Sequence, residues 1–325
     1  MPRPTRVFDD PDAIFFVTNR CFQERLLLRP SRRVNAIILG CMARAARRYE
    51  VEIFGFVILS NHFHFLIRSR KQHLNRFMGL FQGQLAKEMN RLLYRTGAFF
   101  ARRYSAEQVL DDDALLDRYS YIANNPCAAD LVAEPSEWPG LLSHSALMAG
   151  EKLVGTWIDR TELARLRRRS KEYVPESAAE RSFEIELAPL PAHEALDEDS
   201  RRQSLDRAVA SETRRLEEER RIQGRRVMGA RKVLAQDPRR RPSNPKRSQR
   251  PPCHASCDLA RKAHIEHVLN VTRAHGRAVQ RWLARRGTCL GGQDCARRAQ
   301  GSSSSSVVAA SANDPPPICV PSTTM

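Results

Sequence analysis

Two apolar runs separated by the polar pair Ser60-Asn61 constrain the fold more than any other feature of the chain. Residues 51–59 and 62–68 are rich in aromatic and β-branched side chains, a composition typical of strands. The short polar break between them predicts a tight turn. The sequence therefore predicts an antiparallel hairpin at the centre of a sheet.

The second strand of this hairpin places two histidines together. Side chains alternate across a strand, so His62 and His64 share one face while Phe63 and Phe65 face the core on the other. The two histidine backbones are then about 6–7 Å apart, a span that two imidazoles can close onto one cation. The pair is either half of a metal site or two half-exposed histidines on a solvated face.

The surrounding segments predict a β-α-β-β-α-β order followed by one more helix, which is typical of a ferredoxin-like α+β fold with an antiparallel sheet. Around the hairpin we expect a strand at 13–20, a helix at 31–49, a helix at 73–93, a strand at 99–109 and a helix starting at 111. Ser31 can cap the first of these helices, and Asp111-Asp112-Asp113 can cap the last one. Pro126 is expected to end that last helix at Asn125.

The last of these helices carries polar side chains away from its apolar side. At about 100° per residue, Tyr119 faces the core and Tyr121 faces the opposite way. Asn125 lies four residues after Tyr121, so a phenol and a carboxamide share one strip of the helix. The sequence predicts that this strip is turned toward a site.

The charge of the chain points to a polyanionic partner, because the net charge is +17 and the sequence pI is near 10.2. Residues 1–150 carry +5 and the remainder +12, so the second half is either a non-specific phosphate binder or a basic, partly disordered tail. We expect a first domain at 1–160, a basic, mainly helical extension at 161–300 and a disordered tail at 301–325. Helices are expected within the extension at 201–235 and 259–286.

The cysteines and the apolar runs suggest a cytoplasmic protein with no membrane partner. Eight cysteines are too few for a disulfide framework in 325 residues, and no apolar run at the N-terminus is long enough for a leader or a membrane span. Cys253, His254 and Cys257, with Cys289 and Cys295 downstream, could bind zinc. Their spacing departs from the common two-residue knuckle, which favours ordinary cysteines instead.

Taken together, the two halves of the candidate site resemble a known family. A His-hydrophobic-His strand followed by Tyr-x-x-x-Asn-Pro on a helix is similar to the single-tyrosine HUH transposases, above all the REP-associated tyrosine transposases of bacteria. The resemblance covers about residues 8–150, and the 244–255 segment is similar to the extensions of some longer members. The matching stretches are SNHFHFLIR at 60–68, ARRYSAEQVLDDDALL at 101–116 and YIANNPCAADLV at 121–132.

This resemblance implies a chemistry. His62 and His64 would hold a divalent metal, Mg²⁺ or Mn²⁺, with Asn125 as a third ligand, and Tyr121 would attack the scissile phosphate of single-stranded or hairpin DNA. The products would be a 5′-phosphotyrosine and a free 3′-OH. The family also implies a monomer or a homodimer.

Six basic residues flank the proposed site and could hold DNA phosphates, although each could equally be solvated surface charge. They are Arg68, Lys71, Lys87, Arg91, Arg102 and Arg103.

Two other functions remain open at the level of sequence. The chain could be a domesticated, inactive protein that binds hairpin DNA, or a metal nuclease that uses activated water while Tyr121 only positions the substrate. Tyr104 is an alternative nucleophile.

Overall fold

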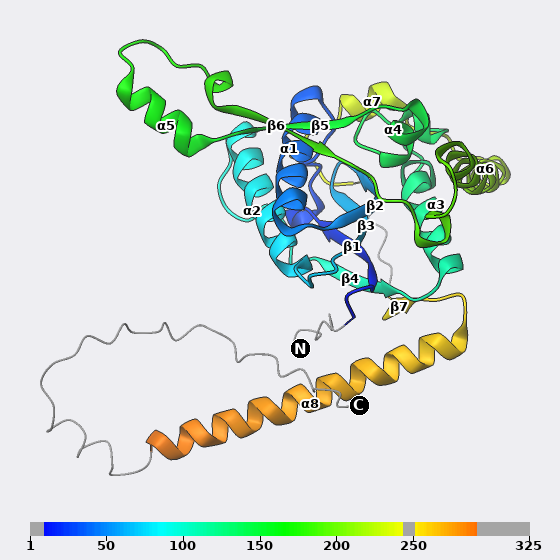
Figure 1. Cartoon of the computed structure of the whole chain (residues 1–325). Coiled ribbons are helices and arrows are strands. Elements are labelled where there is room, and N and C mark those ends of the chain that lie inside the picture. The colour runs from blue at the N-terminus through cyan, green and yellow to red at the C-terminus, as the bar shows by residue number, and fades with distance from the viewer. Residues whose placement is uncertain (1–9, 243–250, 291–325) are drawn as a thin grey trace, which may run out of the picture. The chain divides into compact units, whose positions relative to one another are not determined.

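An antiparallel four-stranded sheet forms the centre of the molecule, in a computed structural model that describes residues 10–242 and 251–290 (Figure 1). The strand order is β2-β3-β1-β4, with each neighbouring pair antiparallel. This order, with helices in the β-α-β-β-α-β connections, confirms the predicted ferredoxin-like α+β fold. The strands are β1 (Ile14–Arg20), β2 (Glu52–Ile58), β3 (His62–Arg68) and β4 (Ser105–Val109).

Helices α1 (Arg32–Tyr49) and α2 (Leu74–Leu92) cover one face of this sheet (Figure 1). Ser31 caps α1 as expected, because its hydroxyl accepts a hydrogen bond from the Val34 amide. Phe63 and Phe65 of β3 pack against Phe81 of α2, with ring centroids 5.6 and 5.4 Å apart. The aromatic face of β3 is therefore core, and the histidine face is left for the other side of the sheet.

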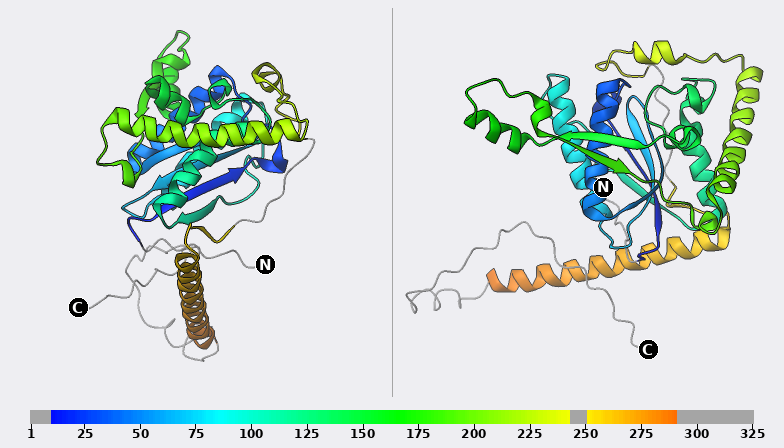
Figure 2. Two further views of the ribbon diagram at one scale, coloured as in Figure 1. Left: turned by 90° about the vertical axis from the view of Figure 1, so that its right-hand side faces the viewer. Right: turned by 45° about the horizontal axis from the view of Figure 1, so that its top comes forward.

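Helix α3 (Asp112–Ala128) covers that second face, and α6 (Glu198–Ile222) packs on the outside of α3 (Figure 2). Leu205, Val209 and Leu216 of α6 are buried in the same core cluster as Leu115 of α3. Burying this much apolar surface against α3 makes part of the predicted extension an integral layer of the fold.

A small second sheet packs on α1. Strand β5 (Leu153–Ile158) pairs with β6 (Glu180–Ile185), and α5 (Arg160–Arg169) lies between them in the chain. The backbones of α1 and β5 meet at Gly40 and Gly155, where a Cβ on Gly40 would lie only 1.9 Å from the Thr156 carbonyl oxygen. Only glycine permits so close an approach.

The remaining elements are short, apart from one long helix near the end of the described chain. They are the 3₁₀ turns Phe22–Glu24, Pro135–Glu137, Glu176–Ala179 and Pro191–His193, the helices α4 (Ser143–Ala149), α7 (Ala230–Leu234) and α8 (Asp258–Leu290), and the strand β7 (Cys253–His254). β7 extends the central sheet by pairing with β4 in parallel.

Three predicted boundaries were wrong. Helix α3 does not end at Asn125 but continues through Pro126 to Ala128, because a proline in the last turn costs only one backbone hydrogen bond. The strand expected at 99–109 begins only at Ser105, after an isolated bridge between Phe100 and Cys21. The helix expected at 201–235 is broken near Gly224 and Gly229, both of which have positive φ.

Residues 10–262 form one compact unit, and the described residues 263–290, the greater part of α8, belong to a second one. No helix in the described part of the chain is long and apolar enough to cross a membrane. The predicted tail at 301–325 and most of the 244–255 segment lie outside the described residues, and the domain boundaries at 160 and 300 stay predictions.

Candidate active site

His62 and His64 lie side by side on the face of β3 that α3 covers. Their ring centroids are 5.0 Å apart and the ring planes are nearly perpendicular, at 89°. Across the sheet they pair with Arg20 and Thr18 of β1, respectively. His64 is buried, and His62 is half-buried at the end of the strand. The alternation of β3 thus brings the two imidazoles together on the face opposite to Phe63 and Phe65.

Two asparagines hold the His62 ring. Its Nδ1 atom lies 2.6 Å from the Oδ1 atom of Asn61, and the Asn125 side chain forms a second hydrogen bond with the ring. An amide oxygen only accepts hydrogen bonds, so Nδ1 donates to Asn61. Burial, together with a smaller effect of the nearby charge of Arg20, lowers the pKa of His62 to about 3. The imidazole is therefore neutral at physiological pH.

The Tyr121 ring lies beside this histidine pair. It projects from α3 with 38% of its surface exposed, and its centroid is 5.5 Å from that of His64. Phe16 of β1 stacks on His64 at 5.0 Å and meets the edge of Tyr121 at 5.8 Å. The Arg118 guanidinium lies 5.0 Å from the Tyr121 ring centroid.

A buried Glu107–His254 pair lies at the edge of the same face, and sequence reasoning missed its role here. The Nε2 atom of His254, in β7, lies 3.1 Å from a Glu107 carboxylate oxygen, while the Ser105 hydroxyl donates to the other oxygen at 2.7 Å. The His254 ring also meets the edge of Phe16 at 5.3 Å. Phe16 is therefore in contact with His64, Tyr121 and His254.

Residues 253–256 also stabilise the N-terminus of α3, the helix that carries Tyr121. Asp111 caps α3 by accepting a hydrogen bond from the Ala114 amide at 2.8 Å. The amide and the hydroxyl of Ser256 both donate to the same carboxylate, each at 2.8 Å. The Leu110 amide donates to the His254 carbonyl oxygen at 2.9 Å. A segment more than a hundred residues downstream thus helps to position α3.

The predicted DNA-binding residues are spread over three places. Arg102 and Arg103 are exposed in the segment before β4, next to the His62 end of the sheet, because the Ala101 amide donates to the Arg20 carbonyl oxygen. Lys87 and Arg91 are on α2, which covers the opposite face, and Arg91 is ion-paired there with a neighbouring glutamate.

The other two predicted basic residues lie at the far end of β3. Arg68 is buried, and its guanidinium pairs with Glu52 at 2.5 Å. Lys71 pairs with Glu50 at 2.6 Å on the surface. Six residues of strand place Arg68 about 20 Å from His62. The alternative nucleophile Tyr104 is buried and precedes β4. Of all the predicted residues, the structure brings together His62, His64, Tyr121 and Asn125.

The side chains that would bind the implied metal can be compared with the ligands that a divalent ion accepts. Two imidazoles and one amide oxygen are suitable ligands for a divalent ion. Within the described ranges, no three His, Cys, Asp or Glu side chains are grouped so that they could hold a metal. The residues therefore fit an open site, in which substrate oxygens or water complete the coordination, rather than a closed structural site.

Comparisons with known proteins point to one family. Residues 25–125 match the family model described as "Transposase IS200 like". Among solved structures, a REP-associated tyrosine transposase bound to a REP hairpin is similar over 43% of this chain and 81% of its own, with 17% identity and a TM-score of 0.36. A candidate transposase from Deinococcus radiodurans R1 is similar over 38% and 95%, with 14% identity and a TM-score of 0.27. No curated protein matches the chain in sequence.

Proposed function

Residues 25–125 belong to the IS200-like transposase family, and from that premise we propose that this protein nicks and rejoins single-stranded DNA with Tyr121 as its nucleophile. The observation that carries the proposal is the 5.5 Å separation between the rings of Tyr121 and His64. It supports a phenol and two metal-binding imidazoles acting on the same phosphate.

In the proposed reaction the phenolic oxygen of Tyr121 attacks the scissile phosphorus. A Tyr–O–P bond forms, the bond from phosphorus to the 3′ oxygen breaks, and that oxygen takes a proton to become a free 3′-OH. The strand stays attached as a 5′-phosphotyrosine, so its rejoining needs no nucleotide triphosphate. The proton that the phenol loses balances the one that the 3′ oxygen gains.

His62, His64 and Asn125 would hold a divalent ion, Mg²⁺ or Mn²⁺. When bound, such an ion polarises the phosphate and neutralises its developing charge. Asn61 keeps His62 oriented by accepting the Nδ1 proton, and burial keeps the ring neutral, so that its lone pair is available as a ligand.

The substrate that we propose is single-stranded DNA next to a hairpin. Arg102 and Arg103, together with Arg20, place positive charge at the His62 end of the sheet, where a strand entering the site would pass. Arg68 makes a weaker contribution in this proposal because its charge is already neutralised by Glu52. Lys87 and Arg91 would contact only DNA that wraps around to α2, and Lys71 only DNA that reaches the far end of β3.

The decisive experiment is the trapping of a covalent protein–DNA adduct. The protein is incubated with a hairpin oligonucleotide and Mn²⁺, and denaturing electrophoresis and mass spectrometry detect the adduct. We expect Tyr121→Phe to abolish the adduct and leave DNA binding intact, because it removes one oxygen that is not buried. Tyr104→Phe serves as the matched control and should still form the adduct.

Each other outcome assigns a different function. An adduct that persists in Tyr121→Phe removes Tyr121 from its role. Cleavage without any adduct indicates a nuclease that uses activated water. Binding without cleavage indicates a domesticated protein that recognises hairpin DNA.

A further inference from the structure

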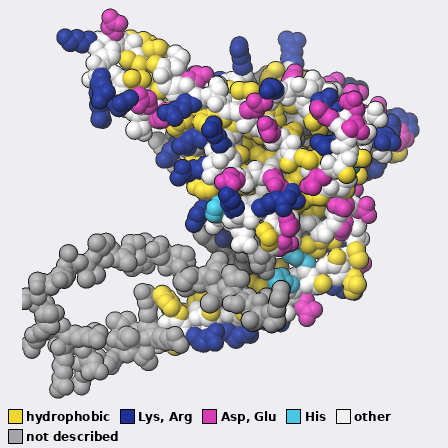
Figure 3. Space-filling view, viewed as in Figure 1, with side chains coloured by type: hydrophobic (Ala, Val, Ile, Leu, Met, Phe, Trp, Pro, Cys, Tyr) yellow, Lys and Arg dark blue, Asp and Glu magenta, His cyan; other side chains and the backbone are white. Residues whose placement is uncertain are grey.

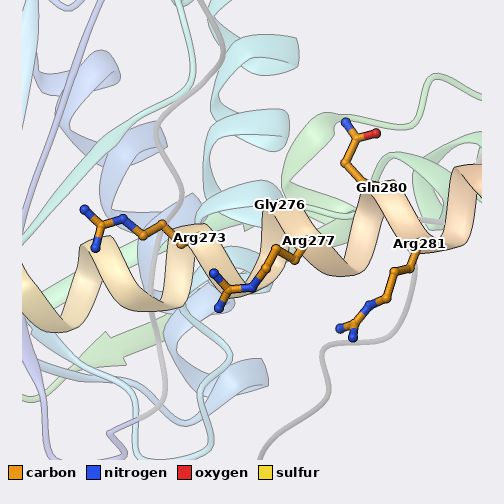
Figure 4. Close-up of a pocket in the computed structure, with 5 residues that line it drawn as sticks. All are labelled: Arg273, Gly276, Arg277, Gln280 and Arg281. Carbon is orange, nitrogen blue, oxygen red and sulfur yellow. The ribbon is translucent and has the colours of Figure 1, made fainter.

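Helix α8 carries a row of arginines. From His267 to its end at Leu290 the helix has five arginines and no Asp or Glu. Arg273, Arg277 and Arg281 follow one another at four-residue intervals and project from α8 as a row, with Gln280 on another side (Figure 4). In sequence, Arg285 continues the spacing.

These arginines differ from those of the other long helix rich in arginine. On α6, Arg202, Arg215 and Arg221 each pair with a glutamate one turn away. None of the carboxylates in the described part of the chain forms an ion pair with Arg273, Arg277 or Arg281. Arg273 donates a 3.5 Å hydrogen bond to the Asn270 side chain. These α6 arginines are thus neutralised within their helix, whereas Arg273, Arg277 and Arg281 of α8 are not.

The spacing of these three arginines is suited to a surface that binds a phosphate backbone. Four residues of helix advance about 6 Å, and three arginines at this interval stay within an arc of about 80°. Gly276 leaves the surface beside them open, since a Cβ there would meet no atom within 4 Å. The exposed apolar residues Trp282 and Leu283 fall outside this arc. Figure 3 shows Lys and Arg side chains gathered on α8, whereas both charge signs alternate over much of the rest of the visible surface.

We propose that Arg273, Arg277 and Arg281 bind the phosphate backbone of duplex DNA, as found in the stem of a hairpin substrate. This inference rests on the proposed function, because it assigns to α8 the part of the substrate that the active site does not process. Duplex DNA carries one charge per about 1.7 Å of its axis, and the planar guanidinium is suited to phosphate oxygens. The groups on α8 bind without reading bases, so they add affinity rather than sequence specificity.

The test is the salt dependence of binding, measured on the full-length protein with a fluorescent hairpin oligonucleotide. The variant carries Arg273→Gln, Arg277→Gln and Arg281→Gln. Three phosphate contacts contribute about 2.7 to the slope of log affinity against log salt. Between 50 and 200 mM salt, the unmodified protein should therefore lose about 40-fold more affinity than the variant.

A control with the same change in net charge separates local contacts from overall attraction. It carries Arg202→Gln, Arg215→Gln and Arg221→Gln on α6, and it should keep the slope of the unmodified protein. An equal loss of slope in both triple variants overturns the proposal, because net charge alone would explain it. Unchanged DNA binding with lost binding to phosphatidylserine vesicles also overturns it, by assigning α8 to a membrane surface.

The same variants distinguish failure of this inference from failure of the proposed function. Adduct formation on a short single-stranded oligonucleotide without a stem should be the same in the α8 variant and the unmodified protein. Tyr121→Phe should lose the adduct and keep the salt slope. If no protein forms an adduct but the α8 variant still shows the shallower salt slope, the proposed DNA-binding surface on α8 is supported and the proposed nicking activity is contradicted.

Discussion

The Asn61 side chain helps to fix the orientation of His62, the half-buried imidazole of the candidate site. Asn61 accepts from His62 at 2.6 Å and is itself buried, and its Nδ2 atom donates to the Glu24 carbonyl oxygen at 3.3 Å. Hydrogen-bond partners of this kind, one step removed from the metal, set the tautomer and the direction of a histidine ligand. Asn61 lies in the turn between β2 and β3, so the predicted turn residue has a second role at the site.

We expect Asn61→Ala to weaken the binding of Mn²⁺ by about 10- to 100-fold, the usual cost of losing such a partner. Asn61→Asp keeps an acceptor for Nδ1 and should restore most of the affinity. Electron paramagnetic resonance of free Mn²⁺ measures the binding without reference to activity. Asn75→Ala, on the exposed side of α2, is the control; equal affinities in all three variants would remove Asn61 from this role.

At the scale of elements, helix α3 is supported from three sides. The sheet lies beneath it, α6 packs on its outer side, and the 253–256 segment bonds to its N-cap. Asn124 shows the outer contact directly, because its Nδ2 atom donates to the Val209 carbonyl oxygen at 3.0 Å and its Oδ1 atom accepts from Thr213 at 2.7 Å.

Removing the cap of α3 should affect both stability and adduct formation. Asp111→Ala loses the bond from Ala114 and both bonds from Ser256, so we expect the free energy of unfolding to fall by about 1–2 kcal/mol. The rate of adduct formation should fall as well, because the helix that carries Tyr121 frays. Asp197→Ala removes the cap of α6 and is the control: it should cost similar stability in urea denaturation, with a smaller effect on the rate.

Local sequence patterns predicted the strand whose side chains alternate between its two faces and the helices that begin with a clear N-cap residue. The histidine strand, the Ser31 and Asp111 caps and the strip bearing Tyr121 all follow from residues close together in the chain. The Glu107–His254 pair could not be predicted in this way, because its members are 147 residues apart and meet only through the pairing of β4 with β7. A two-residue strand such as β7 has no periodicity to detect.

At the scale of the whole molecule, buried histidines make the fold sensitive to acid. His144 of α4 is buried against Tyr119 of α3, and the two side chains form a 3.3 Å hydrogen bond. Burial lowers the pKa of His144 to about 4, and the charge of Asp206 only partly offsets this. The unfolded chain takes up a proton near pH 6.5 that the folded protein does not, so stability present above pH 6.5 is lost as the pH falls toward 4.

We expect this histidine alone to lower the free energy of unfolding by about 2–3 kcal/mol between pH 7 and pH 4.5. The variant His144→Asn should be less stable at pH 7 but should show a flatter dependence on pH across that range. Urea denaturation at several pH values measures both. The exposed His275→Asn is the control and should leave the curve unchanged; a parallel curve for His144→Asn would contradict the assignment.

The packing of α3 between the sheet and α6 has a consequence for how two DNA ends would be exchanged. A nucleophile on a flexible segment can move together with the DNA strand that is attached to it. A nucleophile on a helix that is packed between a sheet and a second helix cannot. The captured 5′ end would stay where it was made. In the strand exchange that we propose, the incoming 3′ end would therefore have to move to the position that the departing 3′ end occupied.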